Sequence, residues 1–223
     1  MAATFVQGAT PTGSAGSPIV IAYGSNVVAG NTLIVFMTHS YLGCPPTVVD
    51  TQLNTWTSKG SQPNPGNSRY FYIFTAVAGS SGANTVTITF ACGTSRMCGI
   101  LEYSGLEADP YNVQNVKLNT ANPCDTGSIT TTTDNELVLS MFTGVTTPTY
   151  SGGSGTTRLT NDINDVIRDE IKASAGAVAP DATASAVSVP YSVQGFVASF
   201  KATASAAVAA PVVKLLQLLG VGT

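Results

Sequence analysis

The chain holds a single histidine, His39, which limits the covalent chemistry that its residues can support. Hydrolysis through a serine or cysteine nucleophile needs an adjacent base, usually histidine, and a carboxylate that orients this base. His39 ends an apolar segment that is typical of a core strand, so we interpret it as a structural residue. The G-x-S-x-G nucleophile elbow is absent, and residues 151–155 (SGGSG) are typical of a flexible loop.

Among the acidic residues, Glu102 is the strongest candidate for chemistry because it stands in an otherwise apolar segment, residues 100–103 (ILEY). A glycosidase needs two facing carboxylates, and a half-buried carboxylate could serve as an acid or as a sugar ligand. An outward-facing Glu102 is the simpler interpretation, and we favour it. The sequence therefore predicts no catalytic residue, and the protein is expected not to be an enzyme.

A second group of acids, Asp162, Asp165, Asp169 and Glu170, lies in one charged stretch and could in principle bind calcium. The D-x-D-x-D-G loop that such a site uses is missing, so we interpret these residues as a solvated strand edge. Phosphate-binding loops and dinucleotide fingerprints are also missing. We expect no metal ion and no cofactor.

Sugar binding needs an aromatic platform beside polar groups, and the sequence offers one candidate set. This possible ligand face comprises Trp56, Tyr70, Tyr72 and Glu102. Aromatic residues of this kind are also ordinary core residues of a β-sandwich, so both interpretations stay open.

Cysteines occur at positions 44, 92, 98 and 124, without the paired C-x-x-C spacing of a zinc site. Cys92 and Cys98 flank a short turn between two strand-like segments. If these segments form a hairpin, the two sulfurs lie close together and could form a disulfide. Four cysteines allow three pairings, and four small buried thiols are an equally simple interpretation.

The composition excludes several classes of protein. Charged residues make up 9% of the 223 residues, against about 25% in typical soluble domains. The formal net charge is −3 with nine scattered basic residues, which argues against a nucleic-acid partner. No segment approaches the roughly 18 apolar residues that a membrane span needs. The first residues lack the basic and apolar regions of a secretory signal, so none is predicted there.

The elements that would carry these residues are strands separated by short turns. Residues 84–90 (NTVTITF) alternate strictly between apolar and polar side chains, and residues 32–38 form a continuous apolar segment. Frequent strands without a convincing long helix predict an all-β fold, an antiparallel two-sheet β-sandwich of jelly-roll type. The predicted strands are residues 18–23, 32–38, 47–49, 55–57, 70–75, 84–90, 97–103, 128–133, 137–143, 157–163, 182–189 and 192–200.

Three local pairings follow from this pattern. Residues 47–57 are predicted to form a tight hairpin with its turn at residues 50–54, and residues 97–103 to pair with residues 84–90. Residues 158–172 (RLTNDINDVIRDEIK) also fit a helix, but the flanking β segments favour two strands joined at Asn164 and Asp165.

The domain organisation is predicted as an N-terminal arm (residues 1–14), a β-sandwich domain (residues 15–201) and an Ala-rich linker with an apolar C-terminal tail (residues 202–223). An exposed apolar tail is costly in water, so we expect it to pack on its own sandwich, on a neighbouring subunit or on a larger scaffold. The residues of this assembly tail are Val212, Val213, Leu215, Leu216, Leu218 and Leu219.

Several phrases together resemble a recurrent β-sandwich module. They are residues 29–35 (AGNTLIV), 49–56 (VDTQLNTW), 82–90 (GANTVTITF), 100–105 (ILEYSG) and 195–201 (GFVASFK). Such jelly-roll, lectin-like modules occur in uncharacterised bacterial exterior proteins and in phage virion or tail-associated proteins. The resemblance covers about residues 15–201 and implies a fold, with no catalytic residue to carry over. Leu53 stands where these modules often have glycine.

Together these observations lead to two principal hypotheses, with a carbohydrate-active hydrolase that uses Glu102 as its catalytic acid as the third and least favoured. The first is a non-enzymatic structural protein of a viral or extracellular assembly, most specifically a phage virion surface or decoration protein. Its partners would be other copies of itself or a larger capsid, tail or filament, at the virion or extracellular surface. The alternative is a carbohydrate-binding or adhesive module that recognises surface glycans.

Overall fold

The computed structural model describes residues 2–11, 16–39, 44–63, 70–95, 97–144, 147–185 and 193–204. Within these ranges every regular element is a β-strand, and every pair of hydrogen-bonded strands is antiparallel. The prediction of an all-β antiparallel fold is therefore confirmed.

The first half of the chain builds a five-stranded sheet in the order β1-β8-β3-β6-β5 and a three-stranded sheet in the order β2-β7-β4. The strands are β1 (Thr4–Ala9), β2 (Ile19–Ala22), β3 (Thr32–His39), β4 (Thr47–Asp50), β5 (Thr57–Pro63), β6 (Tyr70–Val77), β7 (Thr85–Thr89) and β8 (Cys98–Ser104).

The second half builds a five-stranded sheet in the order β9-β18-β12-β15-β14, a three-stranded sheet in the order β10-β17-β13 and a small pair, β11-β16. The strands are β9 (Leu106–Asn119), β10 (Cys124–Asp125), β11 (Ile129–Thr131), β12 (Glu136–Gly144), β13 (Tyr150–Ser151), β14 (Thr156–Thr160), β15 (Val166–Lys172), β16 (Gly176–Val178), β17 (Asp181–Ala184) and β18 (Val193–Ala202).

The two halves have the same topology, so the chain contains two copies of one β-sandwich unit. Replacing β1, β8, β3, β6 and β5 by β9, β18, β12, β15 and β14 turns one five-stranded sheet into the other. The same substitution relates the two three-stranded sheets, and the isolated bridge between Val27 and Gly82 corresponds to β11-β16. We call these units repeat 1 (residues 2–104) and repeat 2 (residues 106–202).

Irregularities of the strands repeat as well. The first strand of each unit has a bulge that places an aromatic residue opposite the last strand, Phe5 opposite Tyr103 and Tyr111 opposite Phe200. The edge strands β5 and β14 are also bulged, after Ser58 and after Thr157. Bulges bend a strand and increase its twist, so shared bulges indicate a shared backbone shape.

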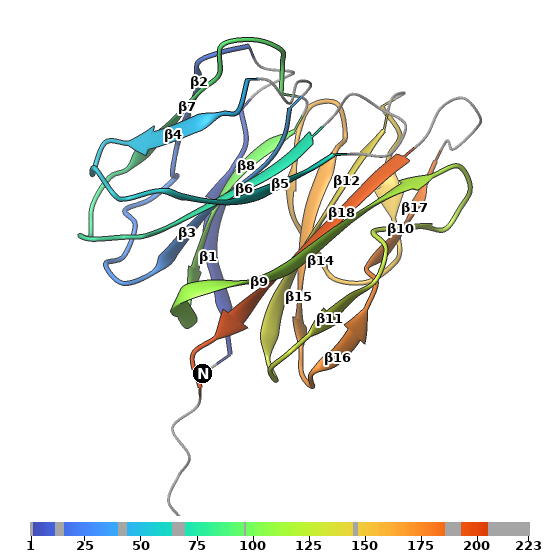
Figure 1. Ribbon diagram of the computed structural model, residues 1–223. Helices are drawn as coiled ribbons and strands as arrows, with labels where there is room; N and C mark the ends of the chain where they lie inside the picture. Colours follow the sequence, from blue (N-terminus) through green and yellow to red (C-terminus); the bar gives the residue numbers. More distant parts are fainter. Residues whose placement is uncertain are drawn as a thin grey trace, which may run out of the picture.

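The repeats pack through their five-stranded sheets, which face each other across a continuous apolar core (Figure 1). Phe71 of β6 stacks on Phe196 of β18 with ring centroids 4.4 Å apart, and Phe36 of β3 lies 4.9 Å from the same ring. Gly99 of β8 permits this approach, because a Cβ there would lie 2.5 Å from Ile167 Cδ1 of the other repeat.

Each five-stranded sheet also has a second buried face, covered by the smaller sheets of its own repeat. Strands β3 and β12 are consequently buried along their whole length. This double burial explains the continuous apolar segment at residues 32–38, since a strand with two covered faces has no reason to alternate. By contrast, β7 has one covered face, and its buried residues Val86 and Ile88 alternate as predicted.

Two predicted hairpins are wrong. Strand β4 pairs with β7 rather than with β5. The loop after Asp50 therefore crosses from the three-stranded sheet, which is the outer sheet of repeat 1, to the five-stranded sheet, which is its inner sheet. Likewise β8 pairs with β1 and β3 rather than with β7. The predicted hairpin at residues 158–172 is confirmed as β14 and β15, with Asn164 in the turn at φ 64°.

The predicted N-terminal arm contains β1, which pairs with β8 and is part of the inner sheet. The predicted single sandwich of residues 15–201 holds most of both repeats. The assembly tail lies outside the described residues. No helix among the described residues is long and apolar enough to cross a membrane.

Candidate functional site

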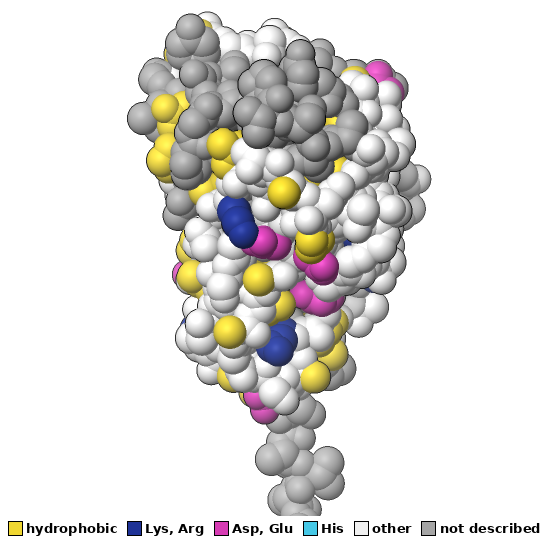
Figure 2. Space-filling model, turned by 90° about the vertical axis from the view of Figure 1, so that its right-hand side faces the viewer, with side chains coloured by type: hydrophobic (Ala, Val, Ile, Leu, Met, Phe, Trp, Pro, Cys, Tyr) yellow, Lys and Arg dark blue, Asp and Glu magenta, His cyan; other side chains and the backbone are white. Residues whose placement is uncertain are grey.

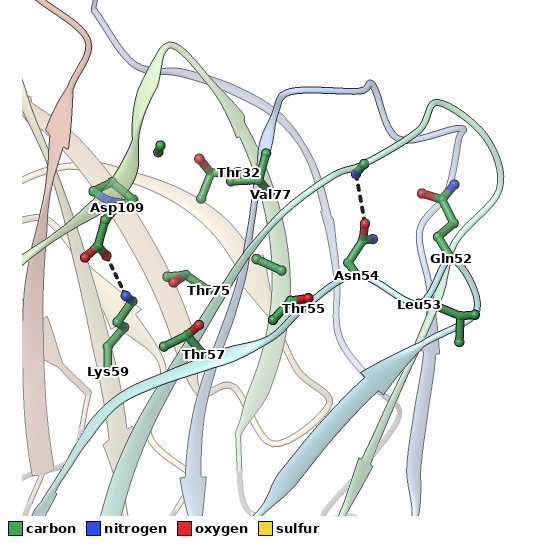
Figure 3. A pocket seen from close by; sticks show the side chains of 14 residues that line it. Thr32, Gln52, Leu53, Asn54, Thr55, Thr57, Lys59, Thr75, Val77 and Asp109 are labelled. Carbon is green, nitrogen blue, oxygen red and sulfur yellow. Dashed lines mark hydrogen bonds and ion pairs between the residues drawn. The ribbon is translucent and has the colours of Figure 1, made fainter.

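A groove lies where the two repeats meet, and we call it the junction groove (Figure 3). Its volume is about 630 Å³, within the range of about 300–1,000 Å³ that is usual for ligand pockets. Repeat 1 supplies the loop after β4 and the strands β5 and β6, and repeat 2 supplies the start of β9. The lining residues are Thr32, Gln52, Leu53, Asn54, Thr55, Thr57, Lys59, Thr75, Ala76, Val77, Gly79, Ala108, Asp109 and Pro110.

One end of the groove holds an ion pair that joins the repeats. The Lys59 ammonium donates a 2.5 Å hydrogen bond to Asp109 Oδ1. Lys59 stands in the bulge of β5, and its side chain is 14% exposed, whereas that of Asp109 is 78% exposed. An ammonium has three donors, and no other hydrogen bond of this one is found among the described residues.

The other end is a loop organised by the buried Asp50 at the end of β4. Asp50 Oδ1 accepts from the Asn54 backbone amide at 2.9 Å, and Oδ2 accepts from the Asn54 side chain at 2.8 Å. Trp56 Nε1 also donates to Oδ2, at 3.1 Å. Asn54 Oδ1 in turn accepts from the Gly79 amide at 2.8 Å, so the loop is tied to the end of β6.

This loop presents two unusual residues to the groove. Leu53 has φ 58° and is 88% exposed, although β-carbon sterics disfavour this backbone region and water disfavours the side chain. Gln52 Oε1 is buried without a hydrogen-bond partner, while its Nε2 donates to the Ala83 carbonyl at 3.2 Å. Figure 3 shows both residues at the opposite end from Lys59 and Asp109.

The predicted ligand face of Trp56, Tyr70, Tyr72 and Glu102 does not form. The three aromatic residues pack against the core between the two sheets of repeat 1, and Tyr72 is 3% exposed. Burial raises the pKa of Tyr72, with a smaller contribution from Tyr70. Glu102 is fully buried, which corrects its outward-facing interpretation.

Glu102 instead links segments of repeat 1 as a buried acceptor. It accepts hydrogen bonds from Gln7 Nε2 at 2.7 Å, from the Val28 amide at 2.8 Å and from Asn31 Nδ2 at 2.6 Å. These bonds explain how an apolar strand accommodates a carboxylate, because a buried charge needs such partners.

Repeat 2 has its own buried carboxylate at the corresponding end of its inner sheet, Glu136. Glu136 Oε1 accepts from the backbone amides of Thr132 and Thr133 at 2.7 and 2.8 Å, and Asn112 Nδ2 donates to Oε2 at 2.9 Å. Glu136 begins β12, at the position equivalent to Asn31, which immediately precedes β3 in repeat 1. The buried carboxylate therefore stands on β8 in repeat 1 and on β12 in repeat 2, which are not equivalent strands.

Two of the acids interpreted as a solvated edge are buried, which corrects that interpretation. Asp165 accepts from the Gly144 amide at 3.2 Å, and Asp169 accepts from Arg158 Nε at 2.7 Å. Within the described ranges, no group of three or more His, Cys, Asp or Glu residues could hold a metal ion.

A smaller groove of about 290 Å³ lies at the equivalent place between β14, β15 and β1. Arg158 in the bulge of β14 corresponds to Lys59, and Asp169 corresponds to Thr75. In this smaller groove the basic side chain is bound by the protein's own residues. Arg158 pairs with Asp169, and its guanidinium lies 4.6 Å from the Phe5 ring centroid.

The remaining candidates have structural surroundings. His39 is fully buried, with Nε2 2.8 Å from the Cys92 carbonyl oxygen.

The predicted pairing of Cys92 with Cys98 is wrong, because Cys92 forms a disulfide with Cys44. Cys98 is a buried free thiol on β8, a strand that is not paired with β7, and burial raises its pKa to about 12.

Comparisons of the chain with protein-family models, with curated proteins and with solved structures found no match. The class that the fold defines is a double antiparallel β-sandwich with a polar groove between its repeats.

Proposed function

We propose that the chain is a non-enzymatic structural protein of a viral or extracellular assembly, most specifically a phage virion surface or decoration protein. In this proposal the double sandwich is a rigid body, and the terminal segments, above all the assembly tail, dock it to other copies or to a capsid, tail or filament.

The observation that carries this proposal is the core shared by the two inner sheets. Side chains from both repeats interdigitate in one apolar cluster, with Phe196 in contact with Phe36 and Phe71. Well-packed interiors resist deformation, so the two units form one body rather than two hinged domains. Such a body is suited to a mechanical role, because a load on one repeat is transmitted to the other.

The hydrogen bonds of the buried carboxylates also support a structural role. Glu102, Glu136 and Asp169 each accept several hydrogen bonds from neighbouring strands or loops. A catalytic carboxylate must reach a substrate, whereas each of these three is at most 6% exposed. They stabilise the fold, and we assign none of them to catalysis.

The surface is poor in charge, as is suitable for close packing with neighbouring subunits. On the described part of the face in Figure 2, backbone and side chains that are neither charged nor hydrophobic predominate, with hydrophobic side chains scattered among them and few Lys, Arg, Asp or Glu. On the outer sheet of repeat 1, Val20 and Val49 flank Thr87 and are 58% and 59% exposed.

The proposal is tested by light scattering coupled to size-exclusion chromatography. We expect the wild-type chain to run as a discrete oligomer, well above its monomer mass of 22.7 kDa. The double substitution Leu215→Asp and Leu218→Asp should yield monomers, because burying charges in an apolar contact is costly. The matched control is Gln217→Asp, which adds a charge at a polar position of the same segment.

A wild-type monomer at all concentrations, or an oligomer that the double substitution leaves unchanged, would contradict the docking role of the tail. The carbohydrate-binding alternative no longer has the support of an exposed aromatic face. The junction groove gives it a different basis, which is independent of assembly.

A further inference from the structure

We propose that the junction groove is a binding site for a neutral carbohydrate chain. This inference goes beyond the structural role, since a rigid assembly protein does not need a polar groove between its repeats. It rests on the composition of the groove, on its unpaired polar atoms and on the exposed Leu53.

The lining combines donors and acceptors without an excess of charge. Thr55 and Thr57 are exposed residues that carry hydroxyl groups, and Gln52 contributes an amide whose oxygen has no hydrogen-bond partner among the described residues. A sugar hydroxyl both donates and accepts hydrogen bonds, so a lining of hydroxyl and amide groups can pair with it in either direction. Small apolar residues at Ala76, Ala108 and Pro110 leave room between these polar groups.

The charges in the groove favour a neutral ligand. Lys59 and Asp109 neutralise each other at 2.5 Å, and the other lining residues are uncharged. An anionic polysaccharide would be attracted by Lys59 and repelled by the more exposed Asp109, which leaves no net attraction. A neutral sugar can instead accept from the ammonium and donate to the carboxylate through neighbouring hydroxyls.

Both ends of the junction groove contain hydrogen-bonding atoms that lack a partner within the described part of the chain. Gln52 Oε1 is a buried acceptor with no partner, and Lys59 uses one of its three donors on Asp109. Buried polar groups are normally paired, so an unpaired one on a residue that lines a cavity points to a ligand that completes it. A chain of sugar residues could reach both ends, which a single small ion could not.

Leu53 supplies an apolar contact at the rim. Its positive φ and its exposure both cost stability, and strained or exposed positions of this kind concentrate at functional sites. Val77, which is 42% exposed, also lines the groove. Each offers an apolar contact for the C–H groups of a sugar, at separate places along the groove, instead of the aromatic platform predicted from the sequence.

A peptide ligand fits the groove less well. An extended peptide would add to a free sheet edge, and β5 is the edge of its sheet. The bulge after Ser58 interrupts this edge, and Gly60 lies close to the Gln114 amide of β9, which crosses it. Strand addition at β5 is therefore obstructed by repeat 2.

The experiment measures binding of the full-length protein to neutral hexasaccharides of glucose, mannose, xylose, galactose and N-acetylglucosamine by calorimetry. Polygalacturonate serves as the anionic probe. We expect at least one neutral hexasaccharide to bind, more tightly than polygalacturonate. The substitutions Lys59→Met and Leu53→Asn should each lower its affinity at least tenfold.

Lys117→Met is the matched control, since Lys117 also forms a 2.5 Å ion pair, with Asp125, at a distance from the groove lining. Leu53→Asn keeps the test valid if Lys59→Met fails to fold, because asparagine tolerates a positive φ. Thermal unfolding of each variant confirms that it is folded.

The inference is overturned if no neutral hexasaccharide binds, if polygalacturonate binds more tightly, or if the two groove variants bind as well as Lys117→Met. These outcomes leave the assembly proposal untouched, because its test depends on the tail.

Discussion

The hydroxyl group of Tyr103 in repeat 1 donates a 2.8 Å hydrogen bond to Asp169 Oδ2 in repeat 2, inside the contact between the two inner sheets. Asp169 Oδ1 accepts from Arg158, whose guanidinium lies over the Phe5 ring of repeat 1. At the equivalent positions on the other side, Phe200 lacks the hydroxyl and Thr75 replaces the carboxylate. The polar cluster of Tyr103, Asp169 and Arg158 is therefore present on one side of the contact between the repeats and absent from the equivalent side.

The first prediction concerns this hydrogen bond. Tyr103→Phe removes a donor and leaves a buried carboxylate oxygen unpaired, which should lower the free energy of unfolding by about 1–3 kcal/mol. Urea denaturation followed by fluorescence measures the change. Tyr111→Phe is the control: Tyr111 occupies the equivalent strand position to Phe5, is partly exposed, and should change stability by less than about 0.5 kcal/mol. Equal effects of the two substitutions would contradict a stabilising role of the bond.

The same residue gives the wild-type protein an alkaline pH dependence. Burial raises the pKa of Tyr103 above its ordinary value of 10.0, and the charge and hydrogen bond of Asp169 raise it further, against an opposing effect of Arg158. Above pH 10 the unfolded chain loses a proton that the folded chain retains, so the free energy of unfolding falls as the pH rises. Tyr103→Phe should reduce this slope.

Strands with strong local patterns could be predicted from the sequence, whereas their partners could not. The alternation at Val86 and Ile88 and the apolar segment of β3 both identify strands. Pairing depends on which sheet the chain enters next, and the loops after Asp50 and before Cys98 each cross between sheets. The rule that consecutive strands pair fails at these crossings.

Edge strands were missed for a different reason. Strand β9 is the longest, yet most of its residues are only partly buried, and shifts of register interrupt any alternation.

The duplication of the β-sandwich unit was missed because the two repeats share a backbone pattern more than residue identity. Asn31 with Glu102 in repeat 1 corresponds to Glu136 with Ser199 in repeat 2, for example.

The junction groove could not be predicted because its residues are distant in the sequence. Lys59 and Asp109, for example, come together only when β9 of repeat 2 crosses β5 of repeat 1. The one available signal was Leu53, a large apolar residue in the polar turn of residues 50–54. Its φ of 58° lies in the left-handed region that favours glycine.

A further prediction contrasts two carboxylates with opposite pKa shifts. Burial alone would raise the pKa of Glu136, but hydrogen bonds from Ser199, Asn112, Thr133 and Thr132 lower it below its ordinary value of 4.5. Its charged form therefore stabilises the fold above pH 4.5, and this contribution is lost as the pH falls through the lowered pKa. Glu136→Gln should be less stable than wild type at pH 7, with a difference that shrinks on acidification.

Glu170 should behave in the opposite way. Burial raises its pKa, with Lys172 opposing and Asp181 and Asp169 adding to the shift, and its Oε1 is buried without a partner. Its contribution to stability is lost as the pH rises through the raised pKa, so Glu170→Gln should be more stable than wild type at pH 7. Urea denaturation between pH 3 and pH 7 measures both variants. A destabilised Glu170→Gln at pH 7 would refute the assignment.

The final prediction concerns the four cysteines, which a thiol-specific reagent can count. Cys98 and Cys124 are free and buried, and burial raises the pKa of both thiols, to about 12 for Cys98. The thiolate is the reactive form, so the native protein should not react at pH 8. In denaturant without reductant, two thiols should react, because Cys44 and Cys92 are joined.

After reduction in denaturant, all four thiols should react. The variant Cys98→Ala separates this pairing from the one predicted from the sequence. It removes one reactive thiol from the denatured, unreduced protein if Cys92 is bonded to Cys44, and adds one if Cys92 is bonded to Cys98. Peptide mapping of the unreduced protein, with residue 44 found linked to residue 92, gives the same assignment by an independent route.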